Sequence, residues 1–386
     1  MSAKPPPPCA MPVMPVPPES ALPSVRPWQA AAADTPGWAA RLSIAWERTW
    51  RWEFWPAWVY YLPILVWILL LGLRHRSPTA FTAANPGLDN GGVVGERKHQ
   101  ALQPLQDHAP DLCATFVLLP EGALDARVQA ALRFAGAVGF PLVLKPDVGQ
   151  RGRGVFIARQ AGDVRDYLRR FDGVVIAQRH IAGEEYGVFI ARGPADAQVQ
   201  VLSIVHKTFP TVVGDGVRTL RELILADARA RLSAQLLFAR WAEALDRIPA
   251  VGETVVLVEI GSHCRGSLFL DATALTTPAL IDTLTRLSDA VPGYGFGRID
   301  LRVPSAAHLQ RGEGLQALEL NGVTAESAHI YHPGTPLLVG YRAMFRQWAL
   351  AFAIGQAQAQ RGATVTSPLQ LWRLWRQDLV RGAQWF

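Results

Sequence analysis

The chain has 386 residues, which is enough for one large or two modest hydrophobic cores. Hydrophobic residues make up 49% and charged residues 18%, an apolar balance for a soluble protein, and the formal net charge is +6. The basic residues do not cluster with aromatic residues in the pattern of a nucleic-acid-binding protein, so we do not expect nucleic acid as a partner. The excess of positive charge instead favours contact with a membrane surface or an anionic substrate. Cys9, Cys113 and Cys264 have no paired spacing, so we expect no disulfide or zinc framework and a reducing cytosolic compartment for the folded part.

The first two segments differ sharply in composition. Residues 1–37 are rich in proline and alanine and predict a disordered tail. Residues 38–76 are dense in tryptophan and contain the apolar run Trp58–Leu73, which predicts a membrane anchor with aromatic residues at the interface. The run has 16 residues, against about 20 for a full span. Because Pro56 and Pro63 interrupt the run, the anchor could be a tilted span, a kinked span or a re-entrant hairpin. The alternative to a membrane anchor is a helix buried in the protein core.

Residues 77–98 form a linker, and residues 99–360 carry the motifs of a catalytic domain. Its first motif is Leu142–Val155, in which a strand ends in Lys145 and a glycine-rich loop follows, with glycines at Gly149, Gly152 and Gly154. Glycines let backbone amides approach phosphate oxygens, and a lysine at the strand end adds a point charge. An ordinary hairpin is the alternative.

The remaining elements predict a mixed domain of strands and helices. In chain order we expect a helix at 125–138, strands at 142–145 and 155–158, a helix at 162–171, strands at 174–178, 185–191 and 199–207, helices at 219–227 and 228–248, a strand at 254–260, a helix at 277–290, strands within 297–303 and 315–327, and a helix at 335–358. This order predicts the α+β class. Residues 361–386 predict a basic, tryptophan-rich amphipathic helix, which lies either on a membrane or on the core.

Two late strands carry the side chains of a candidate cation site. Asp300 lies in GRIDLRV, and Glu319 and Asn321 lie two residues apart in LQALELNGV, so both leave the same face of their strand. Three oxygen ligands on neighbouring strands suit a hard cation such as Mg²⁺. Arg298 shares the face of Asp300 and could neutralise charge on a transferred phosphoryl group. The alternative is that these residues bind no cation and are simply polar side chains at strand ends that face solvent.

The order of lysine, glycine-rich loop, Arg-x-Asp and Glu-x-Asn resembles that of the ATP-grasp ligases, in particular D-alanine–D-alanine ligase and the ATP-grasp part of cyanophycin synthetase. The resemblance covers about residues 96–355. It implies ATP as the nucleotide and Mg²⁺, or Mn²⁺, as the metal, with Asp300, Glu319 and Asn321 as ligands. It also implies that Arg298 lies near the transferred phosphate, that Lys145 and the three loop glycines contact the phosphates, that Gln178, Arg179 and Ile181 hold adenine, and that Glu185 holds the ribose.

A second segment, 206–224, resembles cyanophycin synthetase. Its Gly214–Gly216 turn precedes a helix start at which Thr219 and Glu222 form a capping box. Lys207 ends an apolar strand, and we interpret it as a second cation over the triphosphate.

One departure concerns the acceptor side of the site. Ligases of this family carry a Rossmann-like domain before the ATP-gripping lobes, and the linker is too short for one. The loop 85–98, the membrane or a partner could supply the missing wall, and Lys98 is interpreted as a nucleotide or substrate contact. In the turn that follows Glu259, we expect Arg265, with His263, to orient the acid or amine substrate by binding a carboxylate through two parallel hydrogen bonds. The alternative is that this turn is a surface loop without such a role.

Together these patterns predict an ATP-grasp fold of two α+β lobes preceded by a membrane-associated helical segment. The expected activity is ATP-dependent carboxylate–amine ligation through an acyl phosphate, with a small-molecule acid and amine as substrates, membrane lipid as a partner and the catalytic domain in the cytosol. An ATP-grasp phosphotransferase and a non-catalytic ATP-binding membrane scaffold are the alternatives. The oligomeric state, including a homodimer, stays open.

Overall fold

The computed structural model describes residues 35–149, 152–258 and 267–383. The predicted tail therefore lies almost entirely outside the described residues. The α-helices are α1 (Trp38–Trp50), α2 (Ala57–Arg74), α3 (Lys98–His108), α4 (Leu124–Val138), α5 (Ala161–Arg170), α6 (Leu220–Ala226), α7 (Ala234–Arg240), α8 (Pro278–Ala290), α9 (Ala306–Arg311), α10 (Leu337–Gln360) and α11 (Pro368–Ala383). Single turns of 3-10 helix connect several of them, at Trp52–Phe54, Ala80–Ala83, Asp89–Gly91, Pro110–Leu112, Ala230–Ser233, Ala242–Ala244, Thr273–Leu275 and Ala328–Tyr331.

The strands form antiparallel sheets, which confirms the predicted α+β class. The first sheet has the order β1 (Phe116–Leu119), β4 (Val175–Arg179), β2 (Leu142–Pro146), β3 (Phe156–Ala158). The second has the order β11 (Gln316–Asn321), β10 (Phe296–Val303), β5 (Glu184–Ala191), β6 (Gln200–Thr208), β9 (Leu268–Asp271). A separate pair joins β7 (Thr211–Val213) and β8 (Thr254–Val256).

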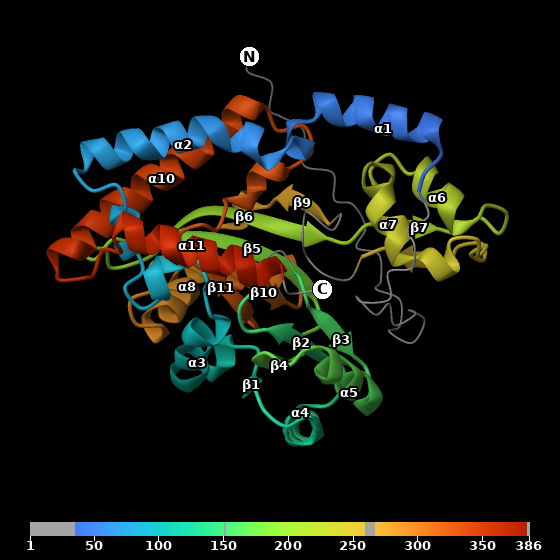
Figure 1. The fold of residues 1–386 in the computed structure, drawn as a ribbon, viewed down its shortest axis with the longest axis horizontal. Helices are drawn as coiled ribbons and strands as arrows, with labels where there is room; N and C mark the ends of the chain where they lie inside the picture. Colours follow the sequence, from blue (N-terminus) through green and yellow to red (C-terminus); the bar gives the residue numbers. More distant parts are fainter. Residues whose placement is uncertain (1–34, 150–151, 259–266, 384–386) are drawn as a thin grey trace, which may run out of the picture.

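The five-stranded sheet is covered on both faces, as Figure 1 shows. Alternate residues of β5 point to opposite sides. Val188 and Ile190 join a cluster with α3 and α8, whereas Phe189 and Ala191 join a second cluster with α2 and α10. A strand buried on both faces reads as a continuous apolar run, which explains the sequence VFIA in β5.

The other two sheets each have a core of their own. Helices α4 and α5 pack on the four-stranded sheet through a cluster that includes Leu144, Phe156 and Tyr167. Helices α6 and α7 pack on the β7–β8 pair through Phe238 and Trp241. The predicted capping box at the start of α6 is present, because Thr219 and Glu222 exchange side-chain and backbone hydrogen bonds.

The predicted helix at 228–248 is wrong as one continuous element. The segment contains α7 between two turns of 3-10 helix, Ala230–Ser233 and Ala242–Ala244. The chain leaves the helix at Trp241, whose buried indole Nε1 donates to the Leu257 carbonyl at 3.0 Å. Tertiary packing around the β7–β8 pair therefore outweighs the local preference for a helix. The strand expected at 254–260 is shorter in the described residues, where β8 ends at Val256.

The tryptophan-dense segment forms two helices, α1 and α2, on one edge of the molecule (Figure 1). Pro63 lies inside α2 without ending it. Among the described residues, α2 is the one helix long and apolar enough to cross a membrane by length and composition. The predicted C-terminal helix is present as α11, with Leu371 packed near α10 and Trp372 and Trp375 about half exposed.

Candidate active site

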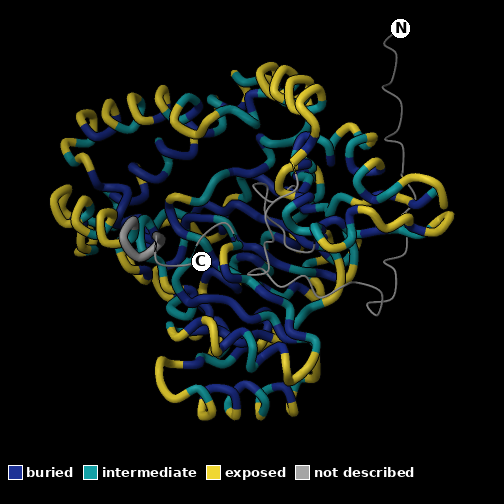
Figure 2. The backbone as a smooth tube through the Cα atoms, turned by 45° about the vertical axis from the view of Figure 1, so that its right-hand side comes forward, coloured by how far each residue is buried: buried dark blue, intermediate teal, exposed yellow. Residues whose placement is uncertain are grey.

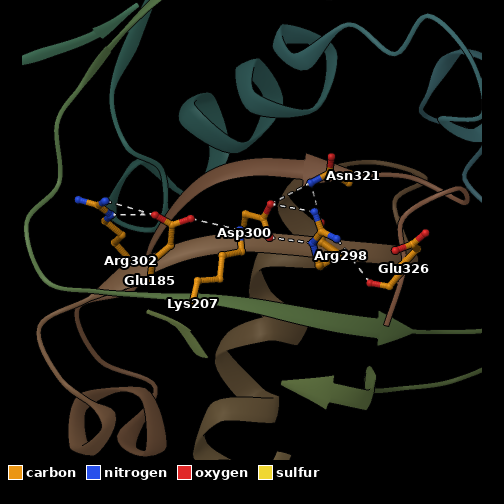
Figure 3. A network of polar contacts seen from close by, with 7 residues as sticks. All are labelled: Glu185, Lys207, Arg298, Asp300, Arg302, Asn321 and Glu326. Carbon is orange, nitrogen blue, oxygen red and sulfur yellow. Dashed lines mark hydrogen bonds and ion pairs between the residues drawn. The ribbon is translucent and has the colours of Figure 1, made fainter. Parts of the chain in front are cut away.

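A chain of charged side chains, three buried and two partly buried, crosses β5, β6 and β10 (Figure 3). Lys207 Nζ lies 3.1 Å from Glu185 Oε1 and 3.1 Å from Asp300 Oδ1. Asp300 also accepts two hydrogen bonds from Arg298, from Nε at 2.8 Å and from Nη2 at 3.1 Å. At the other end, Arg302 Nη2 lies 3.2 Å from Glu185 Oε2. The five charges alternate in sign along the chain, and each contacts an opposite charge, which lets them remain ionised away from water.

The strand register explains how these side chains meet. Glu185 is paired with Lys207 on β6 and with Arg302 on β10, and Asp300 is paired with Gly187 on β5. A Cβ atom at Gly187 would lie 3.0 Å from Asp300 Oδ1. The glycine therefore leaves the space over β5 through which the lysine on β6 reaches the aspartate on β10. Glycine inside a strand commonly marks such a close approach.

Replacing Gly187 by alanine is expected to displace Asp300 and Arg298, because the added Cβ would lie 3.0 Å and 3.1 Å from their side-chain atoms. Overpacking of this kind destabilises a fold by about 1–3 kcal/mol. The melting temperature and MgATP-dependent ADP release should both fall. The matched control is Gly136→Ala in α4, where a new Cβ meets nothing within 4 Å. That change should preserve ADP release and raise stability by roughly 0.5–1 kcal/mol. Unchanged stability and turnover in the Gly187→Ala protein would contradict the argument.

Asp300 is held in its charged form by its two neighbours. Burial alone would raise the pKa of this carboxyl, but Arg298 and Lys207 act in the opposite direction and hold the pKa at about 2. The pKa of Arg298 is raised, because its contact with Asp300 outweighs a burial effect that would lower it. Asp300 is therefore a carboxylate at neutral pH, the form that a cation ligand requires.

Lys145 links the two large sheets. Its buried Nζ donates to Gln178 Oε1 on β4 at 2.8 Å and to the Leu318 carbonyl on β11 at 2.8 Å. The pairing of β10 with β11 skips Leu318, which forms a β-bulge, so this carbonyl can turn toward the lysine. Burial is the largest influence on the lysine and lowers its pKa to about 8.

A second lysine joins the glycine-rich loop to the predicted cation ligands. Lys98 Nζ donates to the Gly149 carbonyl at 2.6 Å and lies 3.6 Å from Glu319 Oε1. Asp147, just beyond β2, fixes the start of α3: its carbonyl accepts from Lys98 N at 3.0 Å, and its carboxylate accepts from His99 N at 2.9 Å. The start of α3 thus places a cation beside the loop, and a contact of Lys98 with nucleotide or substrate stays a prediction.

The described part of the loop has the backbone conformation that its glycines permit. Gly152 and Gly154 have φ of 69° and 70°, in the left-handed region that other residues rarely adopt. The Gly154 carbonyl accepts from the hydroxyl of buried Tyr167 on α5 at 2.7 Å, which ties the end of the loop to the helix that packs on the four-stranded sheet.

The three predicted metal ligands lie on adjacent strands. Asp300 is directly opposite Glu319, and Asn321 Nδ2 lies 3.4 Å from Asp300 Oδ2. The described residues contain no group of three histidine, cysteine, aspartate or glutamate side chains placed to hold a metal. The predicted site has only two carboxylates, and its third metal ligand is the side-chain amide of Asn321. All three donors carry oxygen, and both carboxylates contact lysine or arginine cations. Their chemistry fits a hard divalent cation.

The predicted adenine and ribose contacts lie where β4 passes into β5. Gln178 is buried and also donates to the Ala114 carbonyl at 3.0 Å, whereas Arg179 is exposed. The Ile181 carbonyl accepts from Arg302 Nη1 at 2.6 Å. Glu185 is bound to lysine and arginine, so a ribose contact would compete with these ion pairs. His263 and Arg265 lie outside the described residues.

Two charged residues at the site, Arg302 and Glu96, were not predicted from the sequence. Arg302 lies two residues after Asp300 on β10, and the period of two already indicated a shared face. Glu96 accepts from Gly322 N at 3.3 Å, just beyond β11, and burial is the main cause that raises its pKa to about 8. No motif in the sequence around Glu96 indicates that this residue lies beside the site. It belongs to the 85–98 loop, one of the three candidates for the missing wall, and this loop contacts Gly322 at the end of β11.

Comparisons with known proteins agree with the motifs. No protein-family model matches the chain. The glutathione biosynthesis bifunctional protein GshAB of Streptococcus agalactiae is 22% identical over 229 residues, 53% of this chain and 30% of that protein. Cyanophycin synthetase of Trichormus variabilis is 28% identical over 121 residues, 29% of this chain and 12% of that protein. The chain therefore matches less than a third of the length of either relative.

Among solved structures, D-alanine–D-alanine ligase of Bacillus anthracis aligns with 69% of this chain and 68% of that chain, with 15% identity and a TM-score of 0.39. Cyanophycin synthetase is one of the two proteins that the sequence motifs resemble. The sequence match to it, together with that to GshAB, confirms that this α+β chain resembles the ATP-grasp carboxylate–amine ligases.

Proposed function

We propose that this protein is a membrane-associated ligase that uses MgATP to join a small-molecule carboxylate to an amine. The observation that carries the proposal is the charge network of buried Lys207 and Asp300 with partly buried Arg298, beside Glu319 and Asn321 on the next strand. Phosphoryl transfer requires positioned cations and in-line reactants and little covalent chemistry from the protein. A concentration of paired charges in a buried site suits that task.

The residues divide into two groups by role. Lys145, Lys98 and Lys207 would neutralise the phosphates, and all three side chains are buried. Asp300, Glu319 and Asn321 would hold Mg²⁺, which when bound supplies positive charge to the phosphate oxygens. Arg298, next to Asp300, would stabilise charge on the transferred group.

The reaction follows from these roles in two steps. The substrate carboxylate attacks the γ-phosphorus of ATP, the bond to the β-phosphate oxygen breaks, and an acyl phosphate and ADP form. The amine then attacks the acyl carbon, loses a proton and expels phosphate. The glycine-rich loop would cover the phosphates and keep water from the acyl phosphate.

The deciding experiment is ADP release by the purified protein in detergent with MgATP, across a panel of amino acids and small carboxylates, with hydroxylamine as a trap. Hydroxamate that depends on one acid would establish carboxylate activation and name that acid. ADP release with a stable phosphorylated product and no hydroxamate would favour the phosphotransferase. Absence of ATP binding would favour the scaffold.

We propose further that Arg265, with His263, orients the acid or amine substrate. Arg265→Ala is then expected to raise the apparent KM for that substrate by roughly 10²-fold, because the bidentate bond that the arginine would make to a substrate carboxylate is lost. The Kd for MgATP should not change. A weaker MgATP affinity of the same size would contradict the assignment. The matched control is Arg311→Ala, which removes an exposed arginine paired with Glu313.

The membrane part of the proposal is supported by the composition of α2 and by the tryptophans before it. Tryptophan and tyrosine favour the membrane interface. The need for ATP supports a cytosolic position for the catalytic domain. An anchored ligase would act on substrates close to the bilayer.

A further inference from the structure

Helix α1 carries a single stripe of large apolar side chains that faces solvent. Trp38, Leu42, Trp46 and Trp50 recur every four residues and are between 64% and 77% exposed. Residues four apart lie on the same face of a helix. A stripe of this kind on a soluble helix normally faces the core, whereas here it points away from the protein.

Helix α2 presents a second exposed apolar surface on the same edge of the molecule. Figure 2 colours turns of this helix as exposed. We call the two surfaces together the apolar edge. It consists of the four side chains on α1 and, on α2, of Trp58, Leu62, Leu65, Val66, Leu69, Leu70 and Leu73, which are between 51% and 76% exposed. An exposed apolar area over two helices marks an interaction surface.

The opposite side of α2 is fixed to α10 along its length. The ring of Tyr60 stacks on Tyr341 with centroids 5.3 Å apart, and Trp67 Nε1 donates to the Phe345 carbonyl at 3.0 Å. At the end of the helix His75 contacts Gln356. Further contacts place Ile64 and Leu71 in the same cluster.

These contacts argue against a path of α2 across a bilayer. A crossing helix would have to leave α10 and expose Tyr60 and Trp67, or carry α10 with it. The second course would bring Arg342 and Arg346, both exposed on α10, into hydrocarbon. A charged side chain at the bilayer centre costs at least about 2.5–3.5 kcal/mol. A helix that lies in the plane of the interface keeps all these contacts.

The charges around the apolar edge favour an anionic lipid surface over another apolar partner. Arg41 and Arg48 on α1 and Arg74 and Arg76 at the end of α2 are exposed. The two acids of the segment are each paired, Glu47 with Arg51 and Arg231, and Glu53 with Arg229. Exposed arginines next to tryptophan and leucine are typical of helices that lie in the headgroup region of anionic membranes.

We propose that α1 and α2 form one in-plane docking surface, which inserts the apolar edge into a single leaflet of an anionic bilayer and holds the helix axes parallel to the membrane. The inference rests on the membrane association included in the proposed function, but it does not depend on the ligase chemistry. It replaces a spanning or re-entrant anchor by a surface that belongs to the folded domain.

The test uses the full chain, freed of detergent, with sealed phosphatidylcholine vesicles with and without phosphatidylglycerol. The wild type should float with the anionic vesicles, bind more weakly at high salt, and be released by alkaline carbonate. The double variant L42E/L69E, changed at two exposed positions, should bind at least about tenfold more weakly, because burial of one leucine contributes about 1.5–3 kcal/mol. The matched control is Val251→Glu, an exposed apolar residue on the turn before β8.

Three results would overturn the proposal. Resistance of the wild type to carbonate extraction would show a spanning segment. Equal vesicle binding by wild type and double variant would show that the apolar edge is not the contact. A wild-type dimer that the double variant converts to a monomer, without vesicle binding, would identify a second copy as the occupant. MgATP-dependent ADP release is measured in parallel without vesicles, so loss of docking is distinguished from failure of the ligase assignment.

Discussion

Asp300→Asn is expected to lower MgATP-dependent turnover by at least about 10²-fold, the loss typical of removing one preorganised electrostatic contact in an active site. The carboxylate is opposite Glu319 and is held in its charged form at neutral pH by Arg298 and Lys207. The amide keeps the shape and removes the negative charge that a divalent cation needs. Initial rates of ADP release at saturating MgATP measure the effect.

The same structure predicts a loss of stability in this variant. Asp300 is buried between two cations, and removing one partner of a buried pair costs about 3–5 kcal/mol. Lys207 retains Glu185, so we expect the lower end of that range. Thermal melting must therefore accompany the rate measurement.

Two further variants separate the causes. Glu319→Gln removes the opposite carboxylate at a partly exposed position, and should lose turnover with little change in melting. Asp289→Asn makes the same substitution in an exposed pair with Arg192, and should change neither. Wild-type turnover in a folded Asp300→Asn protein would remove the metal assignment.

The chemistry of this site was visible in the sequence because strands have a simple period. The spacing of Arg298 and Asp300, and of Glu319 and Asn321, placed each pair on one face of its strand. What the sequence could not supply is the register between strands distant in the chain. Only the folded sheet shows that Gly187 clears the path from Lys207 to the aspartate, because that need arises from a cross-strand contact.

The bulge at Leu318 and the packing of α2 likewise depend on contacts between segments distant in the chain, which the local sequence does not reveal. The bulge depends on how β11 pairs with β10, and no residue in the segment requires it. The apolar run predicted a helix, and α2 confirms the helix, whereas its association with a membrane stays a proposal. Composition alone does not reveal which part of the protein a helix packs against. The hydrogen bond from Trp67 to α10 joins residues 278 positions apart, and this contact supports the in-plane orientation that we propose for α2.

Lys145 is expected to give the affinity for MgATP an alkaline limit near pH 8. Burial lowers its pKa to about 8, so the ammonium that attracts phosphate is present below that pH and is lost above it. The free-enzyme kcat/KM for ATP reports such a pKa. Lys145→Arg keeps a cation whose pKa exceeds 12, so its profile should be flat through pH 8 even if its affinity is lower. Binding of MgATP, measured without the amine substrate, avoids the titration of the amine itself.

Unfolding at alkaline pH is the competing explanation, and the direction of the stability change separates the two. The pKa of Lys145 in the folded protein lies below its ordinary value of 10.5, so between about pH 8 and 10.5 the unfolded chain binds more protons at this site. The lysine therefore opposes folding in its charged form, and its titration raises stability as the pH rises through this window. Lys145→Met, which has no such group, should lack the increase. If wild-type MgATP binding weakens above pH 8 while the melting temperature does not fall, the alkaline limit belongs to Lys145. If Lys145→Arg shows the same alkaline limit, Lys145 is not its cause.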